Sequence, residues 1–594
     1  MATKTAEDTQ ALRKTTQPLL PISQQTDSGE GYRLFSTFSL PPDQIKAGYE
    51  SLAESLAEHP VVTLEGFSGV LWEQVQSELE SHLAQHNKPT WLSAADAIKS
   101  ERELEEMLEP YLGGDDPLFG KRYPGTIEDF FDPEKLEQLQ NKLAVASEPV
   151  IVYGCGSSLV APDAFQVYLE VPKNEIQYRA NAGSVMNLGA STPAPPKEMY
   201  KRFYFVDWVI LSRHKAALLD NIDIFADTQR VEAPTFTSGA NLREALNLMQ
   251  QSSLRARPWL APGAWGGQWL QENVDELPPE VNYAWSFELI SPENGFVLES
   301  SQYLLEVSFD VLMFTDPYQI IGSHAERFGH EFPIRFDYLD TVDGGNLSLQ
   351  CHPQEAFIKE EFGESFTQDE TYYLCECTAD AQVYLGFQED IDPAAFRGAL
   401  ERSQETGEQV EVERFVQTHP ANKHDLFLIP RGTVHCSGAG SLVLEISATP
   451  YIFTFKMYDW LRLDLDGKPR PLNIARAFEN LDFEQRGATV PETLIAQPET
   501  LEKTEAYTLA HLPTHEQHFY DIHRIELSGT CTVETGNTCH VLNIVEGSDV
   551  RVTTQNGRTE VYRRLETFLI PAAAGHYTLE ALGGTAKVVK AFLK

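Results

Sequence analysis

The order of the apolar runs changes near residue 236, and this change constrains the fold more than any other feature of the chain. Before it, short apolar runs such as VVTLEG and VIVYG alternate with helical stretches such as FDPEKLEQLQNKLAVA. Alternating strands and helices predict an α/β domain with a largely parallel sheet. After it, short β-type runs follow one another, among them GFVLES, FPIRFDYLD, TYYLCECT and SLVLEIS. This texture is typical of an all-β barrel or double sheet.

Two stretches of the all-β half are similar to each other. HDLFLIPRGTVH at residues 424–435 and LETFLIPAAAGHY at residues 565–577 share an apolar strand, a proline and a glycine turn that leads to a histidine. This similarity indicates two copies of one β-unit. A single helical stretch, DPAAFRGALERSQETGE at residues 392–408, interrupts the β-type runs of this half.

A chain of 594 residues is too long for one hydrophobic core, so we expect several domains. We predict a mobile polar tail over residues 1–30 and an α/β domain over residues 31–235. A first β domain with a short helical insert follows over residues 236–500, and a second β domain over residues 501–594.

The net charge of −42 argues against a nucleic-acid partner, because a phosphate backbone would be repelled. No apolar run approaches the roughly 18 residues that a membrane-spanning helix needs, and the N-terminus lacks the apolar centre of a signal peptide. The seven cysteines are scattered and odd in number, which does not suit a disulfide framework. We therefore expect a cytoplasmic protein that binds neither nucleic acid nor a membrane. Assembly into a homo-oligomer is left open.

The stretch NLSLQCHP, residues 346–353, has the alternation of a half-buried strand with an unusual polar face. Ser348, Gln350 and His352 point to one side of such a strand, and leucine and cysteine residues point to the other. Two further segments offer matching groups: Glu370 at the start of one strand and His435 after a Pro-Gly turn.

Gln350, His352, Glu370 and His435 together provide two imidazoles, a carboxylate and an amide oxygen. Such a set suits Zn²⁺, Fe²⁺, Mn²⁺ or Co²⁺, and the absence of a thiolate makes a purely structural zinc site less fitting. The alternative is that these four side chains are polar groups of a barrel that satisfy one another.

The stretch LSLQCHP resembles the Leu-Ser-x-Gln-x-His-Pro signature of the type I mannose-6-phosphate isomerases, which are metalloenzymes of the cupin (jelly-roll) superfamily. The segments GAWGGQWL, GHEFPIRFDYLDT and YDWLRLDLDGKPRPL also look like segments of that family. The resemblance covers residues 257–594. It implies that Gln350, His352, Glu370 and His435 bind one divalent metal, with Zn²⁺ as the first expectation. The second β-unit has His576 but no Gln-x-His partner, so we expect a metal-free, cupin-like domain there.

The implied reaction interconverts mannose 6-phosphate and fructose 6-phosphate. A base removes the proton next to the sugar carbonyl and gives a cis-enediol, which is then protonated at the neighbouring carbon. The resemblance does not name the base; a metal-bound water, His324, His330 or an acidic residue could serve. Cationic or hydrogen-bonding groups must also hold the sugar phosphate.

The basic groups around the expected site depart from the family pattern. Gln368 stands where a lysine is usual, two residues before the ligand glutamate. Lys456 replaces an arginine before the Tyr-Asp segment, so the charge stays but the bidentate fork is lost. Asp337 replaces a lysine, and Arg335 lies two residues earlier on the same strand face. We predict Lys456 as a catalytic residue.

We predict Ser348, Arg335 and Gln368 as substrate-binding residues. The alternative for Lys456 is an ordinary surface lysine. The alternative for Arg335 is an ion pair with Asp337 or Asp340.

The stretch VVTLEGFSGVLWEQV in the α/β domain has the layout of a phosphate-binding loop, with an apolar strand, a Gly-x-Ser-Gly turn and a helix. A working loop needs Gly-Lys-Ser/Thr at the helix start. Leu71, Trp72 and Glu73 stand there instead. Residues 45–230 loosely resemble uridine-kinase-type nucleoside kinases, which implies a kinase-like domain without catalysis that contacts another subunit or binds a regulatory nucleotide. An unrelated α/β domain is the alternative, because glycine turns after strands are common.

Three functions remain in competition. The first is the metal-dependent isomerase of mannose 6-phosphate. The second is a binding protein, in which a cupin holds a sugar phosphate and signals through the kinase-like domain. The third is an isomerase of a different sugar, which need not be phosphorylated.

Overall fold

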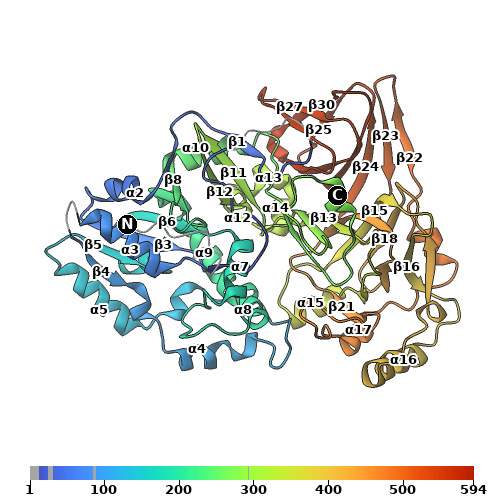
Figure 1. The fold of residues 1–594 in the computed structure, drawn as a ribbon, viewed down its shortest axis with the longest axis horizontal. Coiled ribbons are helices and arrows are strands. Elements are labelled where there is room, and N and C mark those ends of the chain that lie inside the picture. The colour runs from blue at the N-terminus through green and yellow to red at the C-terminus, as the bar shows by residue number, and fades with distance from the viewer. Residues whose placement is uncertain (1–11, 25–30, 85–87, 292) are drawn as a thin grey trace. The chain divides into compact units, whose positions relative to one another are not determined.

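Figure 1 presents the computed structural model, which describes residues 12–24, 31–84, 88–291 and 293–594. The chain divides into two compact units. Unit 1 consists of the described residues within 1–27, 35–248 and 292–315, and unit 2 consists of those within 28–34, 249–291 and 316–594. The protein is therefore multidomain, as its length predicts.

The central sheet of unit 1 contains, in spatial order, β2 (Ile45–Ala47), β8 (Thr235–Ser238), β7 (Ile224–Asp227), β6 (Phe165–Glu170), β3 (Val61–Gly66), β5 (Val150–Tyr153) and β4 (Thr90–Ser93). The five strands from β7 to β4 are parallel neighbours, and β8 pairs antiparallel with β7 on one side and with β2 on the other. The expected α/β arrangement with a largely parallel sheet is present.

Helices connect the parallel strands, as right-handed crossover connections require. The longer helices of unit 1 are α2 (Tyr49–Leu56), α3 (Trp72–Leu83), α4 (Glu101–Leu108), α5 (Pro133–Ala144), α7 (Lys173–Ala182), α8 (Pro196–Arg202), α9 (Trp208–Leu218) and α10 (Gly239–Met249); α2 precedes the first parallel strand and α10 follows the last strand of the sheet. The inner strands are buried almost throughout, which explains their nearly continuous apolar sequences.

Residues 292–315, which we expected in the first β domain, belong to unit 1. They form β11 (Gly295–Ser300), β12 (Tyr303–Ser308) and α12 (Phe309–Thr315). Strand β11 also pairs in parallel with β1 (Thr37–Ser39). Asp310 of α12 forms buried ion pairs with Lys173 at 2.7 Å and with Lys215 at 3.1 Å. The segment is thus tied to unit 1 by strand pairing and by charge.

Part of the tail that we expected to be mobile also has contacts in unit 1. Leu20 is buried, and its backbone N–H donates to Gln229 Oε1 at 3.1 Å. Arg13 forms an ion pair with Glu175 at 3.0 Å. A polar composition did not reveal these anchors. The rest of the predicted tail, at 1–11 and 25–30, lies outside the described residues.

The first part of unit 2 contains two sheets. One consists of β18 (Leu426–Ile429), β15 (Asp369–Cys377), β20 (Ser441–Ala448), β13 (Ile334–Asp340), β10 (Trp285–Leu289) and β9 (Trp259–Ala261). The other consists of β17 (Val416–Pro420), β16 (Gln382–Phe387), β19 (His435–Ser437), β14 (Leu349–Cys351) and β21 (Phe455–Tyr458). The predominance of strands in this region is confirmed, but the expectation of a single helix is wrong, because α13 (Pro317–Ile321), α14 (Ala325–Phe328) and α15 (Glu355–Glu361) also interrupt the strands.

The predicted helical insert is α16 (Pro393–Thr406). The Asp392 side chain accepts from the first backbone N–H groups of the helix, and Gly407 ends it with a positive φ of 74°. These are the usual start and stop signals of a helix.

A second pair of sheets follows. One consists of β22 (Glu499–Lys503), β23 (Tyr507–Leu512), β24 (Tyr520–Leu527), β31 (Ala586–Leu593), β26 (His540–Gly547) and β29 (Thr567–Ile570). The other consists of β25 (Thr530–Glu534), β30 (His576–Ala581), β27 (Val550–Thr554) and β28 (Thr559–Tyr562). Both sheets contribute to one apolar core, which includes Ile525, Val552 and Val588.

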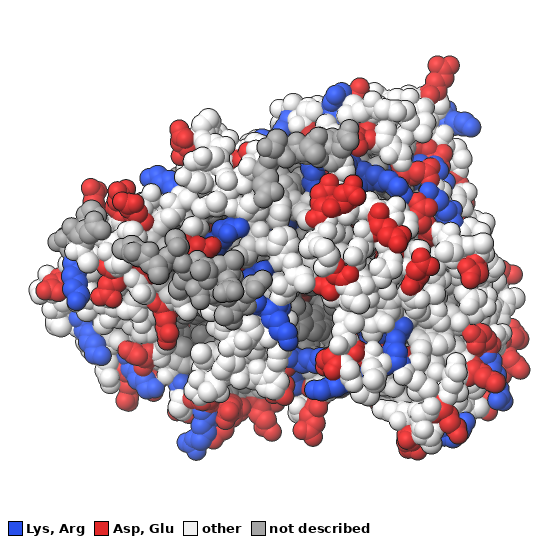
Figure 2. Space-filling view, viewed as in Figure 1, with Lys and Arg blue, Asp and Glu red and all other residues white. Residues whose placement is uncertain are grey.

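Strand register places polar residues of separate strands on one inner face of each sheet, because directly opposed residues of antiparallel strands point the same way. Gln350 of β14 opposes His435 on one side and Lys456 on the other. Glu370 of β15 opposes Ser447 of β20, which opposes Arg335 of β13. Basic and acidic side chains are both scattered over the surface that Figure 2 shows.

Candidate metal centre

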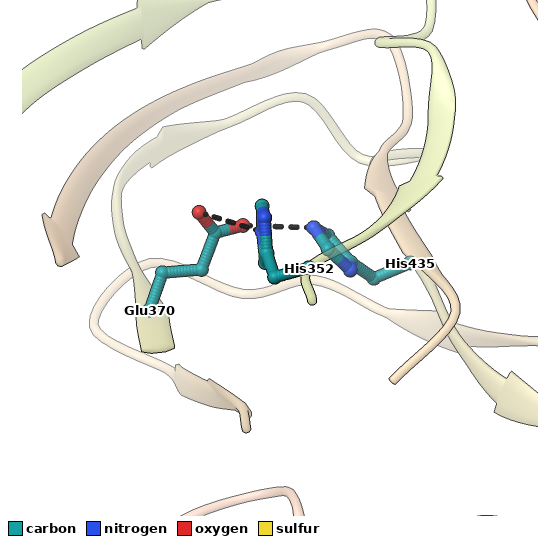
Figure 3. Close-up of side chains that lie close together, drawn as sticks. All are labelled: His352, Glu370 and His435. Carbon is teal, nitrogen blue, oxygen red and sulfur yellow. Dashed lines mark ion pairs between the residues drawn. The ribbon is translucent and has the colours of Figure 1, made fainter. Parts of the chain in front are cut away.

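His352, Glu370 and His435 come together in unit 2 (Figure 3). Glu370 Oε2 lies 3.1 Å from His352 Nε2, and Glu370 Oε1 lies 2.8 Å from His435 Nε2. All three side chains are at most 1 % exposed. Atoms that bind one metal ion with bonds of about 2.1 Å lie about 3 Å apart. The spacing therefore suits a single ion, and this is the one such group among the residues that the structure describes.

Backbone carbonyls fix the orientation of both imidazoles. His352 Nδ1 lies 2.9 Å from the Phe453 carbonyl oxygen, and His435 Nδ1 lies 2.9 Å from the Thr433 carbonyl oxygen. Each Nδ1–H can only donate to such a partner, so each Nε2 presents its lone pair toward Glu370.

Two atoms of this cluster lack a good hydrogen bond. His352 Nε2 and Glu370 Oε1 are buried and have no partner of hydrogen-bonding geometry. Buried polar atoms normally have one. A divalent cation would satisfy both atoms at once, so the residues present fit a metal ion.

The electrostatics of the cluster also favour a cation. Burial opposes ionisation of Glu370, but His352 and His435 outweigh it and hold its pKa well below the usual range. Burial likewise acts to lower the pKa of His352, but the Glu370 carboxylate outweighs it and raises that pKa. The carboxylate thus stays ionised and attracts a positive charge.

Gln350 and Gln368 flank the three residues. Gln350 Nε2 lies 3.3 Å from His435 Nε2, so the fourth predicted ligand is adjacent to the cluster. Gln368 Nε2 donates to Glu370 Oε2 at 3.1 Å, and Gln368 Oε1 accepts from the Phe453 N–H at 2.9 Å. Both ends of the Gln368 amide are therefore used to position Glu370.

Ser348 takes part in a buried polar network beside the cluster. Its hydroxyl donates to Asp459 Oδ1 at 3.0 Å and accepts from Arg470 Nη2 at 2.9 Å. Asp459 also binds Arg462 at 2.8 Å. The network explains why the YDWLRLDLDGKPRPL segment carries these charges: it fastens this segment to β14.

Lys456 and Arg335 lie on the inner faces that carry the cluster. Lys456 is partly exposed and opposes Gln350 across the sheet. Arg335 is 4 % exposed, and its Nη2 donates to the Pro450 carbonyl. Within the described part of the chain, Arg335 forms no ion pair with Asp337 or Asp340.

A pair of carboxyl groups, one on the buried Asp337 and one on the half-buried Glu445, lies one row from Glu370, and sequence reasoning missed it as a pair. Glu445 of β20 opposes both Asp337 and Tyr372. Burial, with the Glu370 charge next, raises the pKa of Asp337 to about 8. The same two causes raise the pKa of Glu445 well above its usual range. A glutamate at an inward position of the apolar run SLVLEIS was the signal that could have found it.

Side chains of unit 1 pack closely around its glycine turn. Residues 66–71 are all buried. Trp208 Nε1 donates to Ser68 Oγ at 2.9 Å, and Arg179 Nη1 donates to the Gly69 carbonyl at 2.7 Å. A Cβ atom at Gly69 would lie 2.7 Å from an Ile176 side-chain atom. Side chains thus fill the space where a phosphate loop would need room.

Three comparisons relate the chain to known proteins. A family model described as "Domain of unknown function (DUF8485)" matches residues 48–251. Mannose-6-phosphate isomerase ManA of Bacillus subtilis is 24% identical over 334 residues, which are 56% of this chain and 97% of that protein. Mannose-6-phosphate isomerase of Streptococcus mutans is 23% identical and covers 48% of this chain and 81% of that protein. The crystal structure of mannose 6-phosphate isomerase from Bacillus subtilis covers 57% of this chain and 99% of that chain, with 20% identity and a TM-score of 0.46.

No helix among the described residues is long and apolar enough to cross a membrane.

Proposed function

We propose that unit 2 is a metal-dependent aldose–ketose isomerase that interconverts mannose 6-phosphate and fructose 6-phosphate. The observation that carries the proposal is the buried cluster of His352, Glu370 and His435, whose two Nε2 atoms face one carboxylate. The similarity to proteins named mannose-6-phosphate isomerase, over almost the whole length of one of them, supports it.

His352, Glu370 and His435 would hold the ion, and Gln350 would join them by turning its amide oxygen toward the site. Two imidazole nitrogens with carboxylate and amide oxygens, and no thiolate, suit Zn²⁺, Mn²⁺, Fe²⁺ or Co²⁺. Of these we propose Zn²⁺. When bound, a divalent cation stabilises negative charge that develops on substrate oxygens.

The chain's own residues would bind the sugar and move the proton. Lys456 lies on the face of Gln350, where its ammonium would hold the phosphate. Isomerisation moves a proton between two neighbouring carbons through a cis-enediol, and the group that carries the proton must reach both. Asp337 and Glu445 share the inner face of Glu370, so we propose that one of these carboxyl groups carries it.

The same carboxyl pair favours a second candidate function, the isomerisation of an unphosphorylated sugar. A phosphate dianion near Asp337 and Glu445 would oppose their ionisation and so their action as a base, whereas neutral sugar hydroxyls can form hydrogen bonds with carboxyl groups in either state. A panel of phosphorylated and unphosphorylated aldoses would separate the two candidates by their kcat/KM values.

For residues 31–235 we infer a kinase-like domain that lacks catalysis. The buried glycine turn and the missing lysine support the lack of catalysis, because the turn has neither the space nor the positive charge to bind a nucleoside triphosphate. Calorimetry with Mg-ATP tests the inference, and nucleotide binding with hydrolysis would contradict it.

The test of the isomerase combines metal content with turnover. We expect about one metal ion per chain, and conversion of mannose 6-phosphate that a chelator abolishes and added Zn²⁺ restores. Glu370→Gln keeps the shape but removes the charge, so it should lose both the metal and the activity. Glu405→Gln on the exposed side of α16 is the matched control. A metal-loaded wild type without turnover on any sugar would refute the isomerase and leave a binding protein.

A further inference from the structure

The second double sheet, expected to be a structural copy, carries a cluster of basic side chains on its inner face. His511, His523 and Lys590 oppose one another in a row across β23, β24 and β31. The row continues into Leu542 and Phe568, which belong to the apolar core of this double sheet. These side chains therefore point into the double sheet and not toward its outer surface.

His540 and Asp521 belong to the next row on the same face, on either side of Phe592. His540 Nδ1 lies 2.8 Å from the Tyr577 hydroxyl, a residue of the opposite sheet. Three histidines and one lysine thus lie in two neighbouring rows of the same face, together with one carboxylate, Asp521. We call His511, His523, His540 and Lys590 the inner basic cluster.

Lys590 is the unusual member of the inner basic cluster. It is 6 % exposed, yet within the described residues it has neither a hydrogen bond nor an ion pair. Its Nζ lies 4.6 Å from the centroid of the Phe592 ring. Buried lysines are almost always paired, because an isolated ammonium loses its hydration without compensation. An anion is the partner that would compensate it.

The other charges do not serve as that partner. Asp521 is engaged by His511, whose Nε2 lies 2.9 Å from Asp521 Oδ2. His523 Nδ1 is a buried nitrogen without a hydrogen-bond partner. Burial lowers the pKa of Lys590 to about 8 and that of His523 to about 4, and the Lys590 charge further lowers that of His523. Burial therefore disfavours the charge of both groups, and the Lys590 charge adds to this effect on His523.

The cluster reaches solvent at one side. The side chains of His511 and Asp521 are 25 % and 20 % exposed, whereas Ile525 and Val588, one row deeper, are fully buried. We propose that this end of the second double sheet is a binding site for a small oxyanion, the phosphate or carboxylate group of a metabolite, with Lys590 as its main charged contact. The imidazoles of His511 and His523 would add hydrogen bonds to the oxyanion.

The test uses the full chain and two probes, inorganic phosphate and acetate, measured by calorimetry and thermal shift. Lys590→Met should weaken the binding of the effective probe about tenfold or more. Lys587→Met is the matched control, because Lys587 lies on the same strand, faces the other way and pairs with Glu546 at 2.9 Å. This control should bind as the wild type does. Phosphate binding alone would assign phosphate groups, and acetate binding alone would assign carboxylates.

Equal binding to wild type and Lys590→Met, or no binding of either probe, would overturn the proposal. A second measurement does not depend on the folding of a variant. Reductive methylation of the wild type, followed by mass spectrometry of its peptides, should modify Lys590 less in the presence of the bound probe. Lys587 should be modified equally with and without it. Equal modification of Lys590 in both conditions would also overturn the proposal.

Discussion

The backbone of Phe453 orients two side chains of the candidate metal centre. Its carbonyl accepts from His352 Nδ1, and its N–H donates to Gln368 Oε1. The sequence could not reveal this role, because a backbone contact leaves no trace in residue type. It does explain how a glutamine can stand where the resembling family has a lysine: an amide bridges Phe453 and Glu370, which an ammonium could not do because it cannot accept.

Gln368→Ala should lower the metal affinity of the chain about 10- to 100-fold, since it frees Glu370 to leave its position. Competition with a chelator of known affinity measures this. Gln497→Ala, at an exposed position, is the control and should change nothing. Unaltered affinity in Gln368→Ala would contradict a positioning role and favour a contact of Gln368 with substrate.

Lys456→Met should lower kcat/KM about 10- to 100-fold without a change in metal content, because it removes a charged contact to the substrate phosphate but no ligand. Steady-state kinetics and metal analysis of one preparation test both halves of this statement. Lys468→Met, an exposed change in the following segment, serves as the control. If Lys456→Met is fully active, Lys456 is an ordinary surface lysine.

At the scale of elements, sequence patterns predicted the parallel sheet, the two β-units and the α16 insert, because periodicity and capping are local. They also pointed to the three residues that the structure brings together. What they missed is non-local. Asp310, far along the chain, forms the ion pairs that neutralise Lys173 and Lys215. Glu445 becomes a neighbour of Asp337 only through the register of their strands.

Asp227 of unit 1 also binds the segment 292–315, and its pKa is raised. Asp227 at the end of β7 accepts from the Glu306 N–H of β12 at 3.0 Å and from Gln229 Nε2 at 2.7 Å. Burial, with the nearby Glu306 charge next, raises the pKa of Asp227 to about 7.

This shift predicts a pH dependence of stability. In the unfolded chain Asp227 loses its proton near its ordinary pKa, but in the folded chain it keeps the proton up to about pH 7. Its contribution to the free energy of unfolding is thus complete below about pH 4 and is lost as the pH rises to about 7, with an upper bound of about 4 kcal/mol.

The Asp227→Asn variant has no ionisable group at this position, so its free energy of unfolding should not show this decrease as the pH rises. Urea unfolding followed by tryptophan fluorescence should show the variant gaining stability over the wild type between pH 4 and pH 7. Parallel pH profiles of the two proteins would contradict the raised pKa of Asp227.

At the scale of the whole molecule, the order of the chain does not match the division into units. All residues of the candidate metal centre lie between 316 and 594, yet the segment 292–315 that precedes them belongs to unit 1. In that segment Phe296, Leu305 and Leu312 are at most 1 % exposed. A fragment that starts at residue 249 therefore carries the complete site together with a segment whose apolar side chains and Asp310 have lost their partners.

We expect the fragment 249–594 to be mostly insoluble or associated when it is expressed alone, because the segment 292–315, which contains β11, β12 and α12, exposes apolar surface and a strand edge. Co-expression with residues 12–248 should rescue it, since β1 and the lysines that bind Asp310 are then supplied in trans. Solubility, size-exclusion chromatography and metal content of the two preparations measure this. Hydrogen exchange should report slow amides in residues 293–315 only in the co-expressed pair. If the fragment alone is monomeric, metal-loaded and as resistant to heat as the full chain, the segment contributes nothing to folding, and the unit boundary belongs near residue 236, where the sequence pattern places it.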